Sequence, residues 1–422
     1  MKRLLFSYKA QALILIFIWI VAMLFSAEFV LTLCMIFLLA IALFELQIDG
    51  QQIRFGLRRK LGSNLRRCWQ YRALAAVAVP FFLVLVSALW STDIGYTLER
   101  LRIKLPFLVM PLAFISIPPF GKRELQVVLY FLLAIMTVAC LYVGMNYLAH
   151  FDAVNDMIGR GKSMPTPSNH IRFSLALAFA VVAGASLWWD DFRLRYDWER
   201  RLTGGMTLFL FFFIHVLSVR SGILVLYLSL SYLAAWYVWR TRRYGYGLGA
   251  ILLVLALPLI TYQMAPSFRQ KMNYMRWDLQ QYLQGKGGDY SDSERLTSLE
   301  VGLQIGNEHP VLGVGAGDLK AEVNRLYATD FHGVYEPRMP HNQLISIYAG
   351  SGLVGLAVFL LAFFYPLFYR KNFRYPLLTA FYLLIFASFM MENTIENNFG
   401  VSFYVLFLLL GLNYLANRPS GL

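Results

Sequence analysis

The chain has 422 residues, of which 58% are hydrophobic and 15% are charged, and its formal net charge is +14. A water-soluble fold cannot bury that much apolar surface, and runs of about 20 apolar residues recur along the whole length, so the composition predicts a polytopic α-helical membrane protein. The positive charge does not indicate a nucleic-acid partner, because Lys and Arg collect in the cytoplasmic loops of membrane proteins.

Twelve apolar segments follow one another along the chain, and each predicts a membrane-spanning helix. Short connections join most of them, and we find no internal repeat that would divide the chain. We therefore expect one integral membrane domain over residues 1–422, an all-α polytopic helical bundle of about twelve transmembrane helices. The predicted spans are residues 11–26, 29–47, 73–90, 102–118, 124–149, 169–189, 202–218, 221–239, 246–264, 342–369, 375–391 and 398–416.

Lys and Arg predict the orientation of this bundle, because they concentrate on the cytoplasmic side. With the N-terminus inside, the inner connections hold more than half of the 38 Lys and Arg residues, including the segment RFGLRRKLGSNLRRCWQYR. Both termini are then expected in the cytoplasm. The long connection 265–341, between the ninth and tenth spans, is expected to face outward, together with the turns at 218–221 and 392–397.

The connection 265–341 has the pattern of a folded loop. In SFRQKMNYMRWDLQQYLQ, apolar residues recur at helical spacing, which predicts an amphipathic helix at the outer membrane surface. A second helix is expected to begin at Ser291 or Ser293 and to end before Pro310. The segment VLGVGAGDL that follows is a Gly-rich turn. Because no strand precedes it, it does not indicate a dinucleotide-binding fingerprint.

Charged side chains at the outer ends of the predicted spans are candidates for function, because a charge near the membrane is costly unless it is paired or used. Arg220 lies between two spans with almost no loop, and Arg295 stands near the start of the second loop helix. His341 opens the tenth span, and Glu392 ends the eleventh. All four can reach one outward-facing cavity if the bundle brings these ends together.

Each of these four residues also has a structural interpretation, which for Glu392 is a local cap or a local ion pair. Arg220 could extend to the lipid headgroups, as arginines at helix ends commonly do. Arg295 could be a solvated surface charge. In the sequence Pro-His-Asn, His341 or Asn342 could simply cap the start of a helix.

Further polar residues share the outward side. Glu396 lies close to Glu392 in the sequence and is an alternative to it beside the histidine. His170 and Arg172 form an outward pair at the start of the sixth span. The remaining candidates for substrate binding are Arg100, near Arg102 and Lys104 at the start of the fourth span, and Arg338 and Asn342 on either side of His341.

No metal site is expected from the sequence. The three cysteines lie in or beside apolar segments without metal-ligand spacing, and the sequence gives only weak support for a His/Glu metal site. The remaining histidines, His150, His215, His309 and His332, are expected to be structural.

Taken together, the outward arginines, histidine and carboxylate suit the attack of a hydroxyl on a carbon whose leaving group is a phosphate or pyrophosphate. Guanidinium groups bind phosphate oxygens through paired N–H donors and stabilise the charge that develops on the leaving group. A neutral histidine accepts the proton of the hydroxyl, and a carboxylate holds the imidazole in the right tautomer. Outward access from a membrane implies a lipid-linked donor.

Two motifs resemble the O-antigen ligase and polymerase superfamily of bacterial envelope glycosyltransferases. RLTSLEVGLQIGNEHPVLGVGAGDL, which starts at Arg295, resembles its Arg-containing loop motif, and PHNQLISIYAGSGLVGL resembles its His-Asn motif. The likeness covers mainly residues 205–400, and the first five spans agree in topology only. Family members often have Asp about fifty positions after the histidine, whereas this chain offers Glu392 or Glu396.

The resemblance implies a GT-C-like enzyme of the bacterial inner membrane, with residues 265–341 as a periplasmic loop that contains short helices and with its active site facing the periplasm. The donor would be an undecaprenyl-pyrophosphate-linked glycan. For a lipopolysaccharide O-antigen ligase, the acceptor would be a sugar of lipid A-core. The implied reaction needs no metal or other cofactor and inverts the anomeric centre. His341 would correspond to the base, and Arg220 and Arg295 to the arginines that bind the pyrophosphate.

Two alternatives remain at this stage. An O-antigen or exopolysaccharide polymerase, or a protein O-oligosaccharyltransferase, shares this chemistry and differs only in the acceptor; the single large outer loop, with no appended soluble domain, favours the ligase. A lipid-linked sugar transporter would need charges deep inside its spans. The charges of this chain lie mostly at the outer ends of the spans, which favours a transferase.

Overall fold

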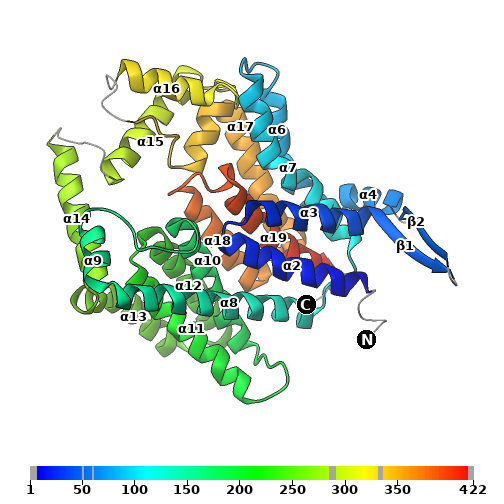
Figure 1. The fold of residues 1–422 in the computed structure, drawn as a ribbon, viewed down its shortest axis with the longest axis horizontal. Helices are drawn as coiled ribbons and strands as arrows, with labels where there is room; N and C mark the ends of the chain where they lie inside the picture. The colour runs from blue at the N-terminus through cyan, green and yellow to red at the C-terminus, as the bar shows by residue number, and fades with distance from the viewer. Residues whose placement is uncertain (1–6, 50–51, 59–60, 285–290, 331–335, 417–422) are drawn as a thin grey trace.

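The computed structural model describes residues 7–49, 52–58, 61–284, 291–330 and 336–416. These residues form eighteen α-helices, two 3-10 helices and one two-stranded hairpin. Figure 1 shows a helical bundle with the hairpin projecting at the right and helices α14, α15 and α16 at the left and top. The all-α expectation is therefore confirmed apart from that hairpin.

Six helices among the described residues are long and apolar enough to cross a membrane, which indicates a multi-pass membrane protein. They are α8 (Lys122–Ala149), α10 (His170–Trp189), α11 (Trp198–Leu217), α12 (Arg220–Thr241), α17 (Gln343–Phe368) together with the 3-10 helix η1 (Tyr369–Arg374), and α19 (Asn398–Ala416).

The other six predicted spans also contain helices. α2 (Tyr8–Leu24), α3 (Glu28–Leu43) and α18 (Pro376–Phe389) are apolar but shorter, and α7 (Ile94–Ser116) and α13 (Tyr244–Met264) complete the set. The predicted span 73–90 is divided into α5 (Arg72–Val77) and α6 (Val79–Ser87). Pro80 explains the division, because proline lacks the N–H that would continue a helix from α5.

Several elements were not expected from the apolar runs. The predicted span 29–47 ends early, because β1 (Phe44–Asp49) pairs with β2 (Gln52–Leu57) as an antiparallel hairpin in which Phe44 faces Leu57. Four short helices lie in predicted connections: α4 (Leu61–Gln70), α9 (Phe151–Gly159), α16 (Leu319–Thr329) and the 3-10 helix η2 (Thr394–Glu396).

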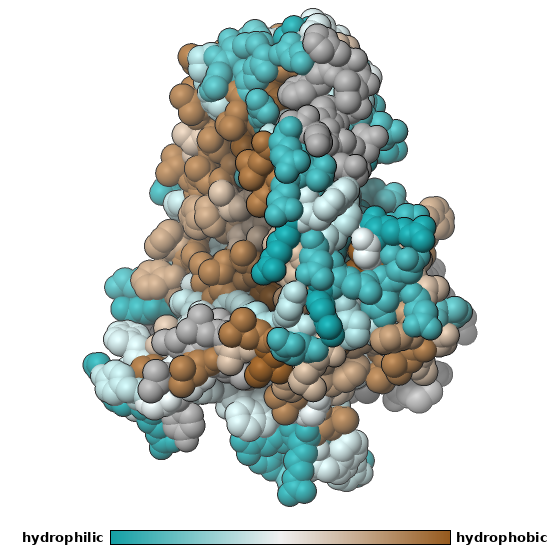
Figure 2. All heavy atoms as spheres, turned by 90° about the vertical axis from the view of Figure 1, so that its left-hand side faces the viewer, coloured by the Kyte–Doolittle hydropathy of each residue, from teal (hydrophilic) through white to brown (hydrophobic). Residues whose placement is uncertain are grey.

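The core lies around α10 and α19, which are the most enclosed of the six long helices, at 72% and 89% buried. Phe179 of α10 packs against Phe407 of α19 and Phe381 of α18, with ring centroids 4.7 and 5.0 Å apart. The exterior is also apolar in large part. Figure 2 shows a broad hydrophobic area beside a hydrophilic strip, as expected of a surface in contact with lipid on one part and water on another.

The connection between α13 and α17 contains both helices predicted there, α14 (Pro266–Leu283) and α15 (Ser291–Glu308). α15 packs tightly against α17 through two glycines. A Cβ atom at Gly302 would lie 2.6 Å from Pro340 Cγ, and one at Gly306 would lie 2.3 Å from Tyr348 Cε1. Glycine is therefore required for this close approach, which fixes α15 against the segment that carries His341.

The Gly-rich turn after α15 packs against an interruption of α17. Gly352 has φ 64° and ψ −170°, so α17 is broken there and the local backbone groups lose their helical partners. The turn replaces them: Val314 N–H donates to Ala349 O at 3.0 Å, and Leu353 N–H donates to Pro310 O at 2.8 Å. Residues 310–315 thus serve as a backbone support for α17.

Candidate active site

The ends of several helices meet at one cavity of about 680 Å³, here called the His341 cavity. The starts of α10, α12 and α17 and the end of α18 contribute to it, and α14 and α15 cover it. Its polar lining residues include Lys162, His170, Arg172, Arg220, Lys271, Glu294, Arg295, Arg338, His341, Glu392 and Asn393. Seven of the nine site residues predicted from the sequence are therefore brought together; the exceptions are Arg100 and Asn342.

His341 and Glu392 lie beside each other in the lining of this cavity. His341 Nδ1 lies 3.4 Å from Glu392 Oε1, and Arg295 Nη2 donates to the same Glu392 oxygen at 3.2 Å. The backbone N–H of His341 donates to Ser298 Oγ at 3.2 Å, so α15 supplies both Arg295 and a contact that fixes the histidine. Of the two carboxylates considered from the sequence, Glu392 is the one that contacts the imidazole; Glu396 pairs elsewhere.

Asn342 fixes the start of α17. Its side-chain oxygen accepts hydrogen bonds from Leu344 N–H at 2.9 Å and Ile345 N–H at 3.2 Å, which is an N-cap. Its Nδ2 donates to Met390 O at 3.2 Å, next to the end of α18. The helix-cap interpretation therefore holds for Asn342. Its side chain also links the start of α17 to the segment that carries Glu392.

Arg220 is held by the loop. Its guanidinium forms a two-pronged ion pair with Asp292, in which Nη1 donates to Oδ2 at 3.0 Å and Nη2 contacts Oδ1. The fully buried Asp278 of α14 accepts from Asp292 N–H at 2.8 Å and from Ser293 Oγ at 2.6 Å, which orients the start of α15. Arg220 is thus attached to the loop and does not simply extend into lipid.

Three further predicted residues line the cavity. Arg338 Nη2 donates to Glu294 Oε1 at 3.0 Å. Asn169 caps α10 by accepting from Ile171 N–H at 3.0 Å, which sets the positions of His170 and Arg172. Within the described part of the chain, the His170 imidazole and the Arg172 guanidinium have no hydrogen-bond or ion-pair partner, so both groups are available to a ligand.

Lys271 also lines the cavity and was not predicted from the sequence. It lies on α14, and its Nζ donates to Gly161 O at 2.9 Å. Burial, followed by the nearby positive charge of Arg220, lowers the pKa of Lys271 from its ordinary value to about 8; Asp292 opposes this and Arg295 adds to it. Its position within an amphipathic helix pattern gave no sign of a role, because the pattern does not say what the polar face meets.

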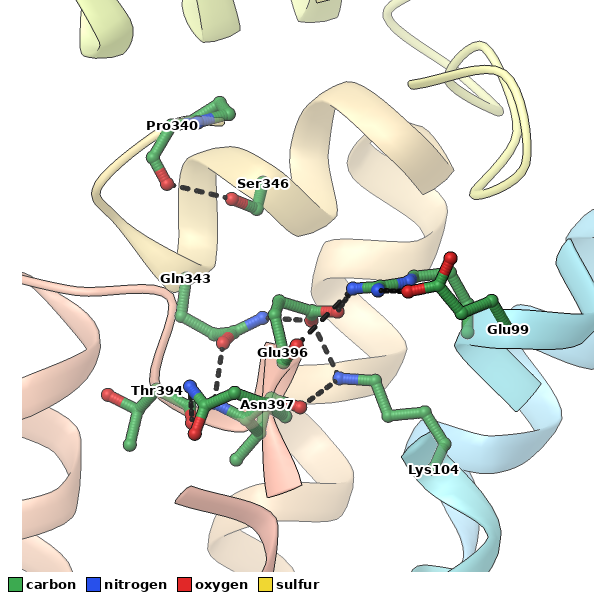
Figure 3. A network of polar contacts seen from close by, with 10 residues as sticks. Glu99, Lys104, Pro340, Gln343, Ser346, Thr394, Glu396 and Asn397 are labelled. Carbon is green, nitrogen blue, oxygen red and sulfur yellow. Dashed lines mark hydrogen bonds and ion pairs between the residues drawn. The ribbon is translucent and has the colours of Figure 1, made fainter. Parts of the chain in front are cut away.

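Arg100 lies in a neighbouring cavity of about 390 Å³, here called the Lys104 cavity. Figure 3 shows its polar network, in which Lys104 Nζ donates to Glu396 Oε1 and to Ile395 O, both at 2.6 Å. Gln343 Nε2 donates to the same Glu396 oxygen at 2.7 Å, and Arg100 Nη1 donates to Glu396 O at 3.3 Å. The two cavities adjoin, because both are lined by Arg172 and Asn393.

Glu396 is therefore the centre of a structural network. Burial acts to raise its pKa, but the charge and hydrogen bond of Lys104 outweigh this effect, and the pKa of Glu396 lies below its ordinary value. Lys104 is only 3% exposed, so its charge depends on this carboxylate. The network joins α7, α17 and η2 directly beneath the start of α17 (Figure 3).

The His341 cavity is strongly positive. Six Lys and Arg side chains line it, against the carboxylates of Glu294 and Glu392. This excess remains after the ion pairs are counted, so the cavity suits an anion with several oxygens, such as a phosphate or pyrophosphate. Among the described residues, no group of three His, Cys, Asp or Glu side chains is placed to hold a metal ion.

The other histidines are placed away from this chemistry. His215 is enclosed in the bundle, where Nε2 lies 2.7 Å from Tyr227 Oη and Nδ1 lies 2.9 Å from Phe211 O. His150 Nδ1 lies 3.2 Å from Asn146 O, and His309 stands exposed beyond the end of α15. His332 lies outside the described residues.

Comparison with known proteins agrees with these motifs. Residues 205–360 match the family model described as O-antigen ligase. That segment contains Arg220, Arg295 and His341, whereas Glu392 lies beyond it. No curated protein matches the chain. The family consists of membrane enzymes of the O-antigen ligase and polymerase type, which are glycosyltransferase-like and act on lipid-linked glycans. Over residues 205–360, the chain is therefore similar to the O-antigen ligase family.

Proposed function

We propose that this protein is an O-antigen ligase-type glycosyltransferase of the bacterial inner membrane. It moves a glycan from undecaprenyl-pyrophosphate to a sugar hydroxyl of lipid A-core at the periplasmic face, in one metal-independent displacement that inverts the anomeric centre. The observation that carries the proposal is the pairing of His341 with Glu392 inside a cavity lined by six Lys and Arg side chains.

The arginines account for donor binding. A guanidinium has five N–H donors, and the Arg220–Asp292 pair engages only two of its nitrogens, so Arg220 is oriented and still has donors to offer. Arg295 is similarly oriented by Glu392. Both groups, with the unpaired Arg172, would hold the pyrophosphate and stabilise the negative charge that it gains as the sugar leaves.

His341 supplies the base. In the proposed mechanism its Nδ1 carries a proton and faces Glu392, so that Nε2 has a free electron pair. Nε2 takes the proton of the acceptor hydroxyl while the hydroxyl oxygen bonds to the anomeric carbon. The bond between that carbon and the pyrophosphate oxygen breaks, and its electron pair leaves with the lipid pyrophosphate. The proton then passes from His341 to water.

Two adjoining cavities match the need for two substrates. The Lys104 cavity meets the His341 cavity at Arg172 and Asn393, and its far wall is apolar, with Leu83 and Val84 of α6 and Phe359 of α17. We assign the second substrate to this space, because an amphipathic wall suits the sugar and lipid parts of a membrane-anchored acceptor.

The test is reconstitution of the purified protein with a lipid-linked glycan and lipid A-core. We expect a new glycoconjugate, and we expect His341→Ala to reduce its formation at least 100-fold while the protein still purifies from membranes. His309→Ala makes the same chemical change at an exposed position on the same loop and should retain wild-type activity. Near-normal transfer by His341→Ala would remove the base assignment.

A deletion strain separates the acceptor classes. Loss of the lipopolysaccharide ladder with accumulation of lipid-linked glycan indicates ligation. A single capped repeat unit would instead indicate polymerisation and would overturn the ligase assignment. Movement of lipid-linked glycan between leaflets without a new glycoconjugate in the reconstituted system would indicate a transporter.

A further inference from the structure

A third cavity, of about 720 Å³, lies at the end of the bundle opposite to His341 and is here called the Arg67 cavity. α7 runs between the two ends: Arg100 lines the Lys104 cavity, and Ser116 lines the Arg67 cavity. At ~1.5 Å per residue, these two positions are separated by about 24 Å of helix, close to the apolar thickness of a bilayer. α17 runs the same way, from His341 to the turn that carries Arg370.

Three arginines from separate elements line this cavity. Arg58 follows β2, Arg67 lies on α4, and Arg370 lies in η1. The only acidic lining residue in the described part of the chain is Glu45. Arginines that converge from different segments, with one carboxylate among them, form a positive site at the level where α7 and α17 end.

The three arginines differ in what they already do. Arg58 Nη1 donates to Ser116 O at 2.7 Å and so binds the carbonyl of the last residue of α7. Arg67 and Arg370 have no carboxylate within ion-pair distance among the described residues. Arg370 lies over the ring of Tyr369, with its Cζ 5.3 Å from the ring centroid. The guanidinium groups of Arg67 and Arg370 are therefore free to bind an anion.

The wall opposite these charges is apolar. Leu74 of α5, Phe114 of α7 and Leu409 and Leu412 of α19 share the cavity with the arginines. A cavity with a positive rim and an apolar wall at the end of membrane helices fits a lipid, because the headgroup phosphate and the start of the acyl chains need these two environments side by side.

We propose that the Arg67 cavity binds the phosphate headgroup of an anionic membrane lipid, through Arg67 and Arg370. This site is separate from the proposed transfer reaction and does not depend on it. The charge pattern of the sequence predicts that this end of the bundle faces the cytoplasm, so the ligand would be an inner-leaflet phospholipid.

The experiment compares two double variants of the full-length protein. Arg67→Gln/Arg370→Gln removes both unpaired guanidinium groups. Arg66→Gln/Lys371→Gln removes the same net charge from neighbouring positions that do not line the cavity. Native mass spectrometry of each protein in detergent, titrated with phosphatidylglycerol or phosphatidylcholine, measures lipid binding. We expect phosphatidylglycerol binding to weaken at least tenfold in the first variant and to match the wild type in the second.

The remaining arms identify the source of the phosphate. Inorganic phosphate should not raise the melting temperature, whereas phosphatidylglycerol should raise that of the wild type but not that of the cavity variant. Equal stabilisation by phosphate would overturn the lipid assignment. Equal loss of lipid from both double variants would indicate surface charge alone and would also overturn it. If the double cavity variant does not purify, Arg67→Gln alone, at an exposed position, gives the same comparison with Arg66→Gln.

Discussion

His341 Nδ1 lies 3.4 Å from Glu392 Oε1, although the two residues belong to the start of α17 and the end of α18. Glu396, only four positions further along, points into a different network with Lys104 and Gln343 (Figure 3). Two carboxylates on one turn thus have separate tasks, one beside the imidazole and one in holding helices together.

This difference predicts opposite results for the two glutamates. Glu392→Gln should lower glycan transfer by about 10- to 100-fold with little effect on the melting temperature, because it removes the charge that orients the imidazole. Glu396→Gln should lower the melting temperature, because it leaves the buried Lys104 charge uncompensated, at a cost of about 3 kcal/mol. Transfer rates and thermal unfolding of both proteins in detergent provide the check. Equal effects on both readouts would contradict the division.

Arg220 and Arg295 should not tolerate lysine. Arg220→Lys and Arg295→Lys keep the charge but lose the planar pair of donors, so each should raise KM for the lipid-linked donor about tenfold. KM for the acceptor should change less. Arg276→Lys, at an exposed position on α14 outside the His341 cavity, is the matched control. Full activity of both Arg220→Lys and Arg295→Lys would argue against a role of these arginines in pyrophosphate binding.

The lowered pKa of Lys271 predicts that donor binding depends on pH. Its pKa of about 8 means that the side chain is charged below pH 8 and loses its charge as the pH rises through that value. Donor KM should therefore increase between pH 7 and 9. Lys271→Arg keeps the charge over this range and should flatten the increase, and Lys271→Met should show a high KM throughout.

As the pH rises, Lys271 should change the stability of the protein and its affinity for the donor in opposite directions. Because the folded protein lowers the pKa of Lys271 below that of the unfolded chain, the unfolded chain binds more protons between pH 8 and about 10.5. The contribution of Lys271 to stability without ligand should therefore rise over this range, while donor affinity falls. If stability and donor affinity changed in the same direction, the pH dependence could not be assigned to Lys271.

The contact between the Gly-rich turn and the interruption of α17 should not tolerate an added methyl group on either side. A Cβ atom at Gly352 would lie 2.1 Å from Val311 O, and one at Gly313 would lie 2.4 Å from Ser351 N. Both residues also have positive φ angles. Gly352→Ala and Gly313→Ala should each destabilise the protein by about 3 kcal/mol or more, as measured by thermal unfolding. Gly205→Ala, in a helix with no atom near the new Cβ, should be neutral or slightly stabilising.

Much of the helical framework was predictable because hydropathy and helical spacing act over short stretches of chain. All twelve apolar segments contain helix, and the loop helix that was expected to begin at Ser291 or Ser293 begins at Ser291. The predicted spans were wrong where a short sequence feature interrupts an apolar run. Pro80 divides one predicted span, and β1 begins at Phe44, inside the apolar run that predicts the second span.

The site was predictable only in part, because its members come from distant segments. The outer ends of the spans indicated His341 and Arg220, since a charge there needs a reason. Nothing in the sequence distinguished Glu392 from Glu396, and nothing placed Lys271 beside Arg220. These relationships depend on how α14 and α15 fold over the helix ends, which is determined by packing between residues far apart in the chain.

The interruption of α17 at Gly352 has a mechanical consequence. Because residues 310–315 take over backbone hydrogen bonds at the break, the first half of α17 is joined to the loop as well as to its own second half. Under the proposed function, a donor that draws Arg295 toward its phosphates would also displace the segment that carries His341. Donor binding and the position of the base would then be mechanically coupled.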